Sequence, residues 1–193
     1  LIIKFISIYS TNFDLFGDEA QYWLWSKNLD FGYFSKPPLL PGIIALVCLV
    51  FGNSFFVIKT ISVLIYCVSS YVIFLISKKL YNNFDLALLT AASFFLMPAV
   101  SVSSFLVSTD IVLVLFWSLA LLQTLIIKEK PSILNFILLG VFVGLAFLTK
   151  YAAIYFLIST IFLLFEKTMR NVFFKNKLFF LFFILTFIII IAP

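Results

Sequence analysis

Long apolar runs, separated by short gaps that hold most of the charge, constrain this chain more than any other feature. Of its 193 residues, 64% are hydrophobic, only 11% are charged and 27 are phenylalanine. A soluble domain carries about 25% charged residues, so lipid or other helices must surround most side chains here. An open sheet edge would leave backbone groups unsatisfied in hydrocarbon, which favours helices for every span. We therefore predict an all-α, polytopic transmembrane helical bundle.

Seven segments approach the length of about 20 apolar residues that crosses a bilayer as a helix. The segment 38–52 is also apolar, but it is short and bounded by prolines and Gly52, so we predict a re-entrant or interfacial helix there. The chain begins and ends inside apolar runs, so we expect a fragment with a single transmembrane domain. The predicted spans lie near residues 1–11, 54–77, 86–108, 111–127, 132–149, 151–165 and 178–193, with an exterior loop over 12–53.

Alternating the spans sorts the basic residues to one side. The segments 78–85, 128–131 and 166–177 hold eight of the thirteen lysines and arginines, which makes that side cytoplasmic by the positive-inside rule. Five of the eight acids then face the periplasm, cell surface or lumen. We expect a multi-pass protein of the plasma (inner) membrane with its chemistry on the exterior face. The basic residues form no continuous stripe, so nucleic acid is not an expected partner.

Residue types that are absent or isolated exclude several kinds of site. There is no histidine, and the two cysteines, Cys48 and Cys67, lie inside apolar stretches. Imidazole bases, histidine-ligated metals and a disulfide framework are therefore not expected. A carboxylate is the natural alternative as a general base.

The loop 14–40 is the least membrane-like part of the chain. Gly17 permits a sharp exit from the first span, and a short helix is expected over 20–29, ended by a turn at 30–32. Tyr22, Trp23 and Trp25 are residue types found at headgroup depth, so this helix should lie along the membrane surface.

The acidic pair Asp18-Glu19 stands at the start of this expected helix. At helical spacing Asp18 shares a face with Tyr22 and Trp25. Two acids at a helix start can simply stabilise the helix N-terminus through the macrodipole. Their position at the boundary between headgroups and water also suits chemistry on a lipid headgroup.

Three elements of the sequence resemble a known family. The loop from Asp18 to Leu40 resembles the first external loop of GT-C glycosyltransferases, in the dolichyl-phosphate-mannose protein mannosyltransferase-like and aminoarabinose-transferase-like group. Ser108-Thr109-Asp110, followed by an apolar run with Trp117, resembles that group's small-x-Asp element. Gly144-Leu-Ala-Phe-Leu-Thr-Lys-Tyr151 is similar to its Gly-Leu-x-x-Leu-x-Lys-Tyr element.

The resemblance implies a GT-C fold with an exterior juxtamembrane helical loop and an enzyme activity. Such a hexosyl- or pentosyltransferase takes a sugar from a polyprenyl-phosphate carrier and passes it, usually with inversion, to a lipid, glycan or protein acceptor on the exterior face. The carrier phosphate is a competent leaving group, so a base and one or two cations suffice. By resemblance Asp18 is the catalytic base, supported by Glu19. Burial of Asp18 near lipid would favour proton uptake.

Other residues are candidates for binding the substrates. Lys36 and Lys150 are cations available for the lipid phosphate, although a lysine at a span end often only reaches toward headgroups. Thr109 is the better N-cap by position, which would leave Asp110 to bind acceptor hydroxyls or, with Asp18, a divalent metal ion. Lys59 either reaches toward headgroups or pairs with an acid. The expected substrate-binding residues are Tyr22, Lys36, Asp110, Lys150 and Tyr151.

Ser35 departs from the family pattern, because many relatives have an acid or another polar residue at this position. Serine cannot replace a carboxylate, so a metal site, the acceptor and activity itself stay open. The alternative from another class is a transporter or lipid flippase, which would hold its coupling charges near the bilayer midplane. A non-catalytic membrane scaffold is the third interpretation.

Overall fold

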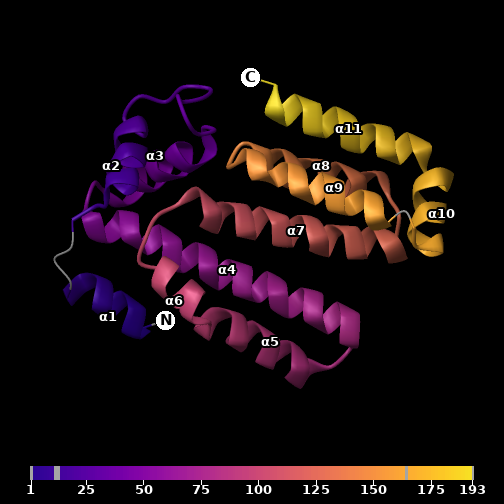
Figure 1. Ribbon diagram of the computed structural model, residues 1–193, viewed down its shortest axis with the longest axis horizontal. Coiled ribbons are helices and arrows are strands. Elements are labelled where there is room, and N and C mark those ends of the chain that lie inside the picture. The colour runs from indigo at the N-terminus through magenta and orange to yellow at the C-terminus, as the bar shows by residue number, and fades with distance from the viewer. Residues whose placement is uncertain (1, 11–13, 164, 193) are drawn as a thin grey trace.

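The computed structural model describes all residues except 1, 11–13, 164 and 193, and every element in that part of the chain is helical. The all-α prediction is confirmed. The longest helices lie side by side in a row. Shorter elements lie at the two ends of these helices, with α2 and α3 at one end and α10 at the other (Figure 1). The elements are α1 (Ile2–Ser10), α2 (Gly17–Trp25), α3 (Leu39–Phe51), α4 (Phe55–Tyr81), α5 (Phe84–Leu96), α6 (Pro98–Ser103), α7 (Thr109–Glu129), α8 (Ile133–Phe147), the 3-10 turn η1 (Tyr151–Ala153), α9 (Ile154–Leu163), α10 (Lys167–Lys175) and α11 (Lys177–Ile191).

The row combines antiparallel pairs, α4–α5 and α7–α8, with parallel pairs, α4–α7 and α8–α11 (Figure 1). Helix α5 packs on α4, α4 on α7, α7 on α8, and α8 on α11. Among the described residues, α4 and α7 are each long and apolar enough to cross a membrane, and α9 with α10 would make a third span but bends by 102° between them. The apolar helices α3, α5, α8 and α11 are shorter. Helices therefore occur where spans were predicted, and the number of crossings stays a prediction.

The predicted span 86–108 is divided into two helices by a proline. Pro98 cannot donate a backbone hydrogen bond and disfavours helical backbone at the residue before it. Met97 accordingly takes an extended conformation, with φ −54° and ψ 133°. Helix α6 restarts at Pro98 and ends at Ser103, so residues 104–108 run to the start of α7 without helical structure.

Side chains from α4 satisfy the polar groups around this non-helical segment. The Ser62 hydroxyl donates to the Leu106 carbonyl at 2.8 Å, and the Tyr66 hydroxyl bonds the Ser103 hydroxyl at 2.7 Å. Irregular backbone at membrane depth is tolerated only where protein or a water-filled cavity surrounds it. The segment 104–108 can therefore place a backbone amide at the site described below.

Two glycines bring α8 unusually close to α11. A Cβ atom added at Gly140 would lie 2.7 Å from the Phe183 carbonyl oxygen, and one added at Gly144 would lie 2.8 Å from the Ile190 Cγ2 atom. Small residues four apart let helix backbones approach closely in membrane proteins. Gly144, which opens the family-like element 144–151, therefore has a packing role.

Ion pairs gather three of the loops at one end of the bundle. Lys79 pairs with Glu129, and Lys128 pairs with Glu166, each at 2.6 Å. We call the segments 78–85, 128–131 and 166–177 the basic end. Their grouping was predicted from the charges and is confirmed.

The opposite end holds the loop with the acidic pair. The Leu39 amide donates to the Leu148 carbonyl at 3.0 Å, which joins the end of that loop to the end of α8. We call the segments 14–53, 104–110 and 148–153 the acidic end. Which compartment each end faces stays a prediction.

Candidate functional site

Helix α2 positions the acidic pair, but it begins and ends earlier than the sequence predicted. It runs from Gly17 to Trp25, so the predicted bounds 20–29 are wrong. Tyr33 explains the early end, because its ring stacks on Trp25 at 4.5 Å and its hydroxyl donates to the carbonyls of Trp25 and Asn28 at 3.1 and 3.2 Å. These bonds satisfy carbonyls that a longer helix would have used.

Glu19 is buried and fully engaged. Its side chain is 2% exposed, and its Oε1 atom accepts the Val107 amide at 2.6 Å. Its Oε2 atom accepts the Phe16 amide at 2.9 Å and lies 3.4 Å from the Lys59 ammonium. Glu19 therefore joins α2, α4 and the segment 104–108. Lys59, whose role the sequence left open, pairs with this acid.

Asp18 has the opposite surroundings. Consecutive helical residues point about 100° apart, so the carboxylate of Asp18 faces outward and is exposed while that of Glu19 faces inward. No hydrogen bond or ion pair within the described residues engages the Asp18 carboxylate. Of the two acids, Glu19 is the one that is buried, and it is enclosed by protein groups.

Tyr22 lies between the two acidic elements of the site. It is 2% exposed, so it packs inside the protein, and its predicted depth in the membrane stays a prediction. Its hydroxyl shares a hydrogen bond with the side chain of Thr109. Burial raises the pKa of the Tyr22 phenol, and the charges of Asp18 and Asp110 raise it further, against the opposing effect of the Thr109 bond. The phenol is therefore neutral and connects α2 to the start of α7.

Thr109 does not cap α7, which corrects the sequence prediction. Ser108 occupies the N-cap position without a side-chain cap bond, and Thr109 is the first helical residue. Its side chain is buried against Tyr22. Tertiary contact with α2 therefore overrides the local capping preference.

Asp110 forms an ion pair with Lys150. The Lys150 ammonium lies 2.6 Å from the Asp110 Oδ1 atom, and the two side chains are 34% and 62% exposed. Asp110 stands in the first turn of α7, where the helix dipole favours a negative charge. Asp110 and Lys150, both expected at the exterior end but in separate roles, thus meet although they are 40 residues apart in sequence.

Of the remaining candidates, Tyr151 lines a cavity at the same end, whereas Lys36 only precedes a lining residue in the sequence. A cavity of about 470 Å³ is lined by Pro37, Pro38 and Tyr151, together with apolar residues of α8 and α11. Tyr151 is 69% exposed. Lys36 directly precedes Pro37 and is half-buried, and its ammonium has no ion pair within the described part of the chain. The cavity thus adjoins the Asp110–Lys150 pair through the sequence neighbours Lys150 and Tyr151.

A divalent metal ion at this end of the bundle stays a prediction. No group of three or more histidine, cysteine, aspartate or glutamate side chains among the described residues could hold one. Of the two acids that we considered for this role, Asp110 is paired with Lys150 while Asp18 is exposed.

One functional group escaped the sequence reasoning, namely the backbone amide of Val107. It donates the shortest of the hydrogen bonds to Glu19. The available signal was Pro98, which prevents one continuous helix across 86–108, together with the serines that follow it. A proline inside an apolar run can indicate where irregular backbone meets a site.

Comparison with known proteins found a matching family and a similar curated protein. The family described as Dolichyl-phosphate-mannose-protein mannosyltransferase matches residues 35–193, which include Lys36, Asp110, Lys150 and Tyr151 but not the acidic pair. Lipid A galacturonosyltransferase RgtD from Rhizobium johnstonii is 38% identical over 143 residues, which is 74% of this chain and 30% of that protein.

The matched segment thus spans less than a third of the length of this curated relative. No solved structure matches the chain. The family match covers most of the chain, including all four predicted substrate-binding residues outside α2 and the whole row of helices from α3 onward. The chain therefore belongs to the dolichyl-phosphate-mannose-protein mannosyltransferase family of GT-C membrane proteins.

Proposed function

We propose that the protein of which this chain is part transfers a sugar from a polyprenyl-phosphate carrier to an acceptor hydroxyl at the acidic end of the bundle. The observation that supports this most is the placement of an unpaired, exposed carboxylate, Asp18, on a helix whose Tyr22 contacts the helix start bearing Asp110. The buried Glu19 holds that helix in place.

The proposed step is a single displacement. The acceptor hydroxyl oxygen attacks the anomeric carbon, its proton passes to the Asp18 carboxylate, and the bond from that carbon to the phosphate oxygen breaks with its electron pair leaving on the phosphate. Attack on the face opposite the leaving group inverts the anomeric carbon. Lys36 and Lys150 are placed at this end to neutralise the phosphate charge that develops.

We further propose a glycolipid acceptor of the lipid A type. The relative's name couples a galacturonosyl group with lipid A. The cavity of about 470 Å³ between Pro37, Pro38 and the ends of α8 and α11 opens beside Tyr151 and has an apolar lining suited to a lipid chain. The end of the bundle that holds it is predicted to face the exterior of the plasma membrane.

The test is transfer of labelled sugar by the complete protein in proteoliposomes. Polyprenyl-phosphate galacturonic acid with lipid A is the first substrate pair, and polyprenyl-phosphate mannose with a serine peptide is the second. We expect product from the first pair only, and we expect Asp18→Asn to lower its rate by about 10²–10⁴-fold.

Asp14→Asn is the matched control, because Asp14 is an exposed acid of the same loop outside α2. We expect it to transfer at the parent rate. If Asp18→Asn transferred as fast as the parent, the assignment of the base would be wrong. Movement of the carrier lipid between leaflets without any product would favour a flippase instead.

A further inference from the structure

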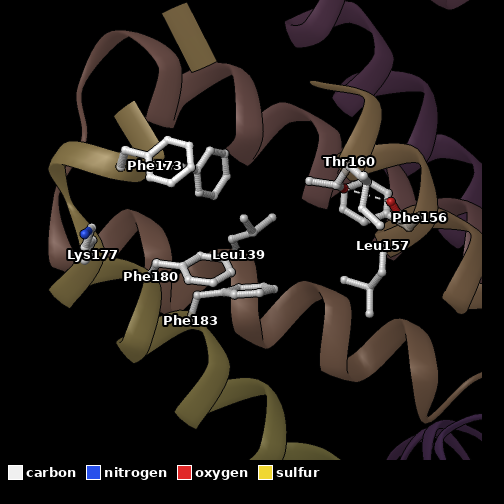
Figure 2. A pocket seen from close by; sticks show the side chains of 10 residues that line it. Leu139, Phe156, Leu157, Thr160, Phe173, Lys177, Phe180 and Phe183 are labelled. Carbon is white, nitrogen blue, oxygen red and sulfur yellow. Dashed lines mark hydrogen bonds between the residues drawn. The ribbon is translucent and has the colours of Figure 1, made fainter. Parts of the chain in front are cut away.

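A second cavity lies toward the basic end, away from the acidic pair. It measures about 480 Å³ and opens between α8, α9, α10 and α11. Figure 2 shows phenylalanine rings from three of these helices turned toward one space, with Leu139 between them. Its size falls within the range of about 300–1,000 Å³ that is typical of ligand pockets. The residues that define its interior include Leu139, Phe156, Leu157, Phe173, Phe180 and Phe183.

The interior offers no polar partner to a ligand. The hydroxyl of Thr160, which also lines the cavity, donates to the Phe156 carbonyl of its own helix at 2.8 Å, as the dashed line in Figure 2 marks. Among the described lining residues, Lys177 is the only charged one, and it stands at one edge of the set in Figure 2. An apolar chain with a negative group at one end therefore matches the cavity.

Helix α10 adds further positive charge beside Lys177. The helix is amphipathic, with Met169 buried and Phe173 half-buried on one face and Lys167, Arg170 and Lys175 exposed. Within the described residues these cations form no ion pairs, because the nearby acid, Glu166, already pairs with Lys128. The 102° bend between α9 and α10 turns this charged helix across the end of the bundle (Figure 1).

We propose that this cavity binds one acyl chain of an anionic phospholipid, with the lipid phosphate on Lys177. Basic pockets between membrane helices bind anionic headgroups. Charge complementarity favours a net-negative lipid over a zwitterionic one, and the phenylalanine lining favours an acyl chain. The site is independent of the proposed transferase reaction, because it contains none of the residues assigned to that reaction.

The experiment measures lipid binding to the complete purified protein by native mass spectrometry. The probes are dioleoyl phosphatidylglycerol and dioleoyl phosphatidylcholine at equal concentrations. We expect the parent to bind phosphatidylglycerol more tightly, and we expect Lys177→Gln to weaken that binding about fivefold. Lys78→Gln is the matched control, since Lys78 is an exposed lysine of the basic end that does not line the cavity. It should retain the parent affinity.

A second variant pair tests the acyl chain separately. Thr160→Trp fills the cavity and should weaken binding of both lipids, whereas Thr160→Val leaves the cavity open and should bind as the parent does. The unfolding temperature in lipid-free detergent checks that each variant is folded. Three outcomes would each overturn the proposal. The first is equal binding of both lipids by the parent, and the second is an equal effect of Lys177→Gln and Lys78→Gln. The third is unchanged binding by folded Thr160→Trp. An interior already filled by another segment of the complete protein would give the first of these results.

Discussion

The Glu19–Lys59 pair at the acidic end is buried but has the longer N–O distance. The Lys79–Glu129 pair at the basic end is exposed but has the shorter one. The closest N–O distance is 3.4 Å in the first pair and 2.6 Å in the second. The Glu19 and Lys59 side chains are 2% and 8% exposed, whereas those of Glu129 and Lys79 are 57% and 23% exposed. Glu19 also accepts two backbone amides.

The difference teaches that distance is a poor guide to the importance of an ion pair. An exposed pair whose partner is removed returns to water, and such pairs contribute only about 0–1 kcal/mol. A buried pair that loses one partner leaves a charge without solvent, which costs about 3–5 kcal/mol. The longer pair should therefore determine the geometry of the acidic end, while the shorter pair should be nearly dispensable.

The largest effect is expected for Glu19→Gln. The substitution keeps the shape of the side chain but leaves the Lys59 ammonium buried without a countercharge. We expect a loss of about 3–5 kcal/mol in the free energy of unfolding, measured by denaturant unfolding of the complete protein in detergent micelles. The double variant Glu19→Gln with Lys59→Met should recover part of that loss. If the single variant Glu19→Gln were as stable as the parent, Glu19 would not have the proposed positioning role.

The next effect concerns the α8–α11 contact, which runs between the two ends. A side chain at Gly140 would meet the backbone carbonyl of Phe183, which cannot move aside as a flexible side chain could. We expect Gly140→Val to lower the free energy of unfolding by about 1–3 kcal/mol. Gly42→Ala is the control, because a Cβ atom there meets nothing within 4 Å. Equal stabilities of the two variants would argue against the close approach of these helices.

Helix positions could be predicted because they depend on local apolar runs. Helices α4, α7, α8 and α11 fall inside or close to predicted spans, and Asp110 meets Lys150 at the end where both were expected. The resemblance to the family, read from three short elements, is confirmed by the match over 35–193.

Features that depend on distant contacts could not be predicted. Glu19 and Val107 are 88 residues apart, and the bond between them requires the non-helical segment 104–108 to lie beside α2. The early end of α2 depends on Tyr33, and the orientation of Thr109 depends on Tyr22. Local propensity contains no information about such partners, so the roles of the two adjacent acids could not be distinguished from sequence.

A smaller effect is expected for Tyr22→Phe, which removes the bond to Thr109. We expect a loss of about 0.5–1.5 kcal/mol at neutral pH. The raised pKa of the phenol also predicts a pH dependence. The folded protein holds the phenol proton more tightly than the unfolded chain does, so stability is retained below the ordinary pKa of 10.0 and falls as the pH rises above it. Unfolding curves at pH 8 and pH 11 should show this fall in the parent and a smaller fall in Tyr22→Phe. Identical falls would show that the phenol does not titrate as described.

The smallest effect is expected for Glu129→Gln, the same chemical change as Glu19→Gln made at the basic end. Lys79 keeps access to water when its partner becomes neutral, so the free energy of unfolding should fall by about 0–1 kcal/mol. Added salt should reduce even this difference, because exposed charges are screened at high ionic strength. The two variants should therefore be compared by denaturant unfolding at low and high salt. Only the loss of stability in Glu19→Gln should persist at high salt. If the two variants lost the same free energy of unfolding at low salt and again at high salt, the proposed dependence on burial would be contradicted.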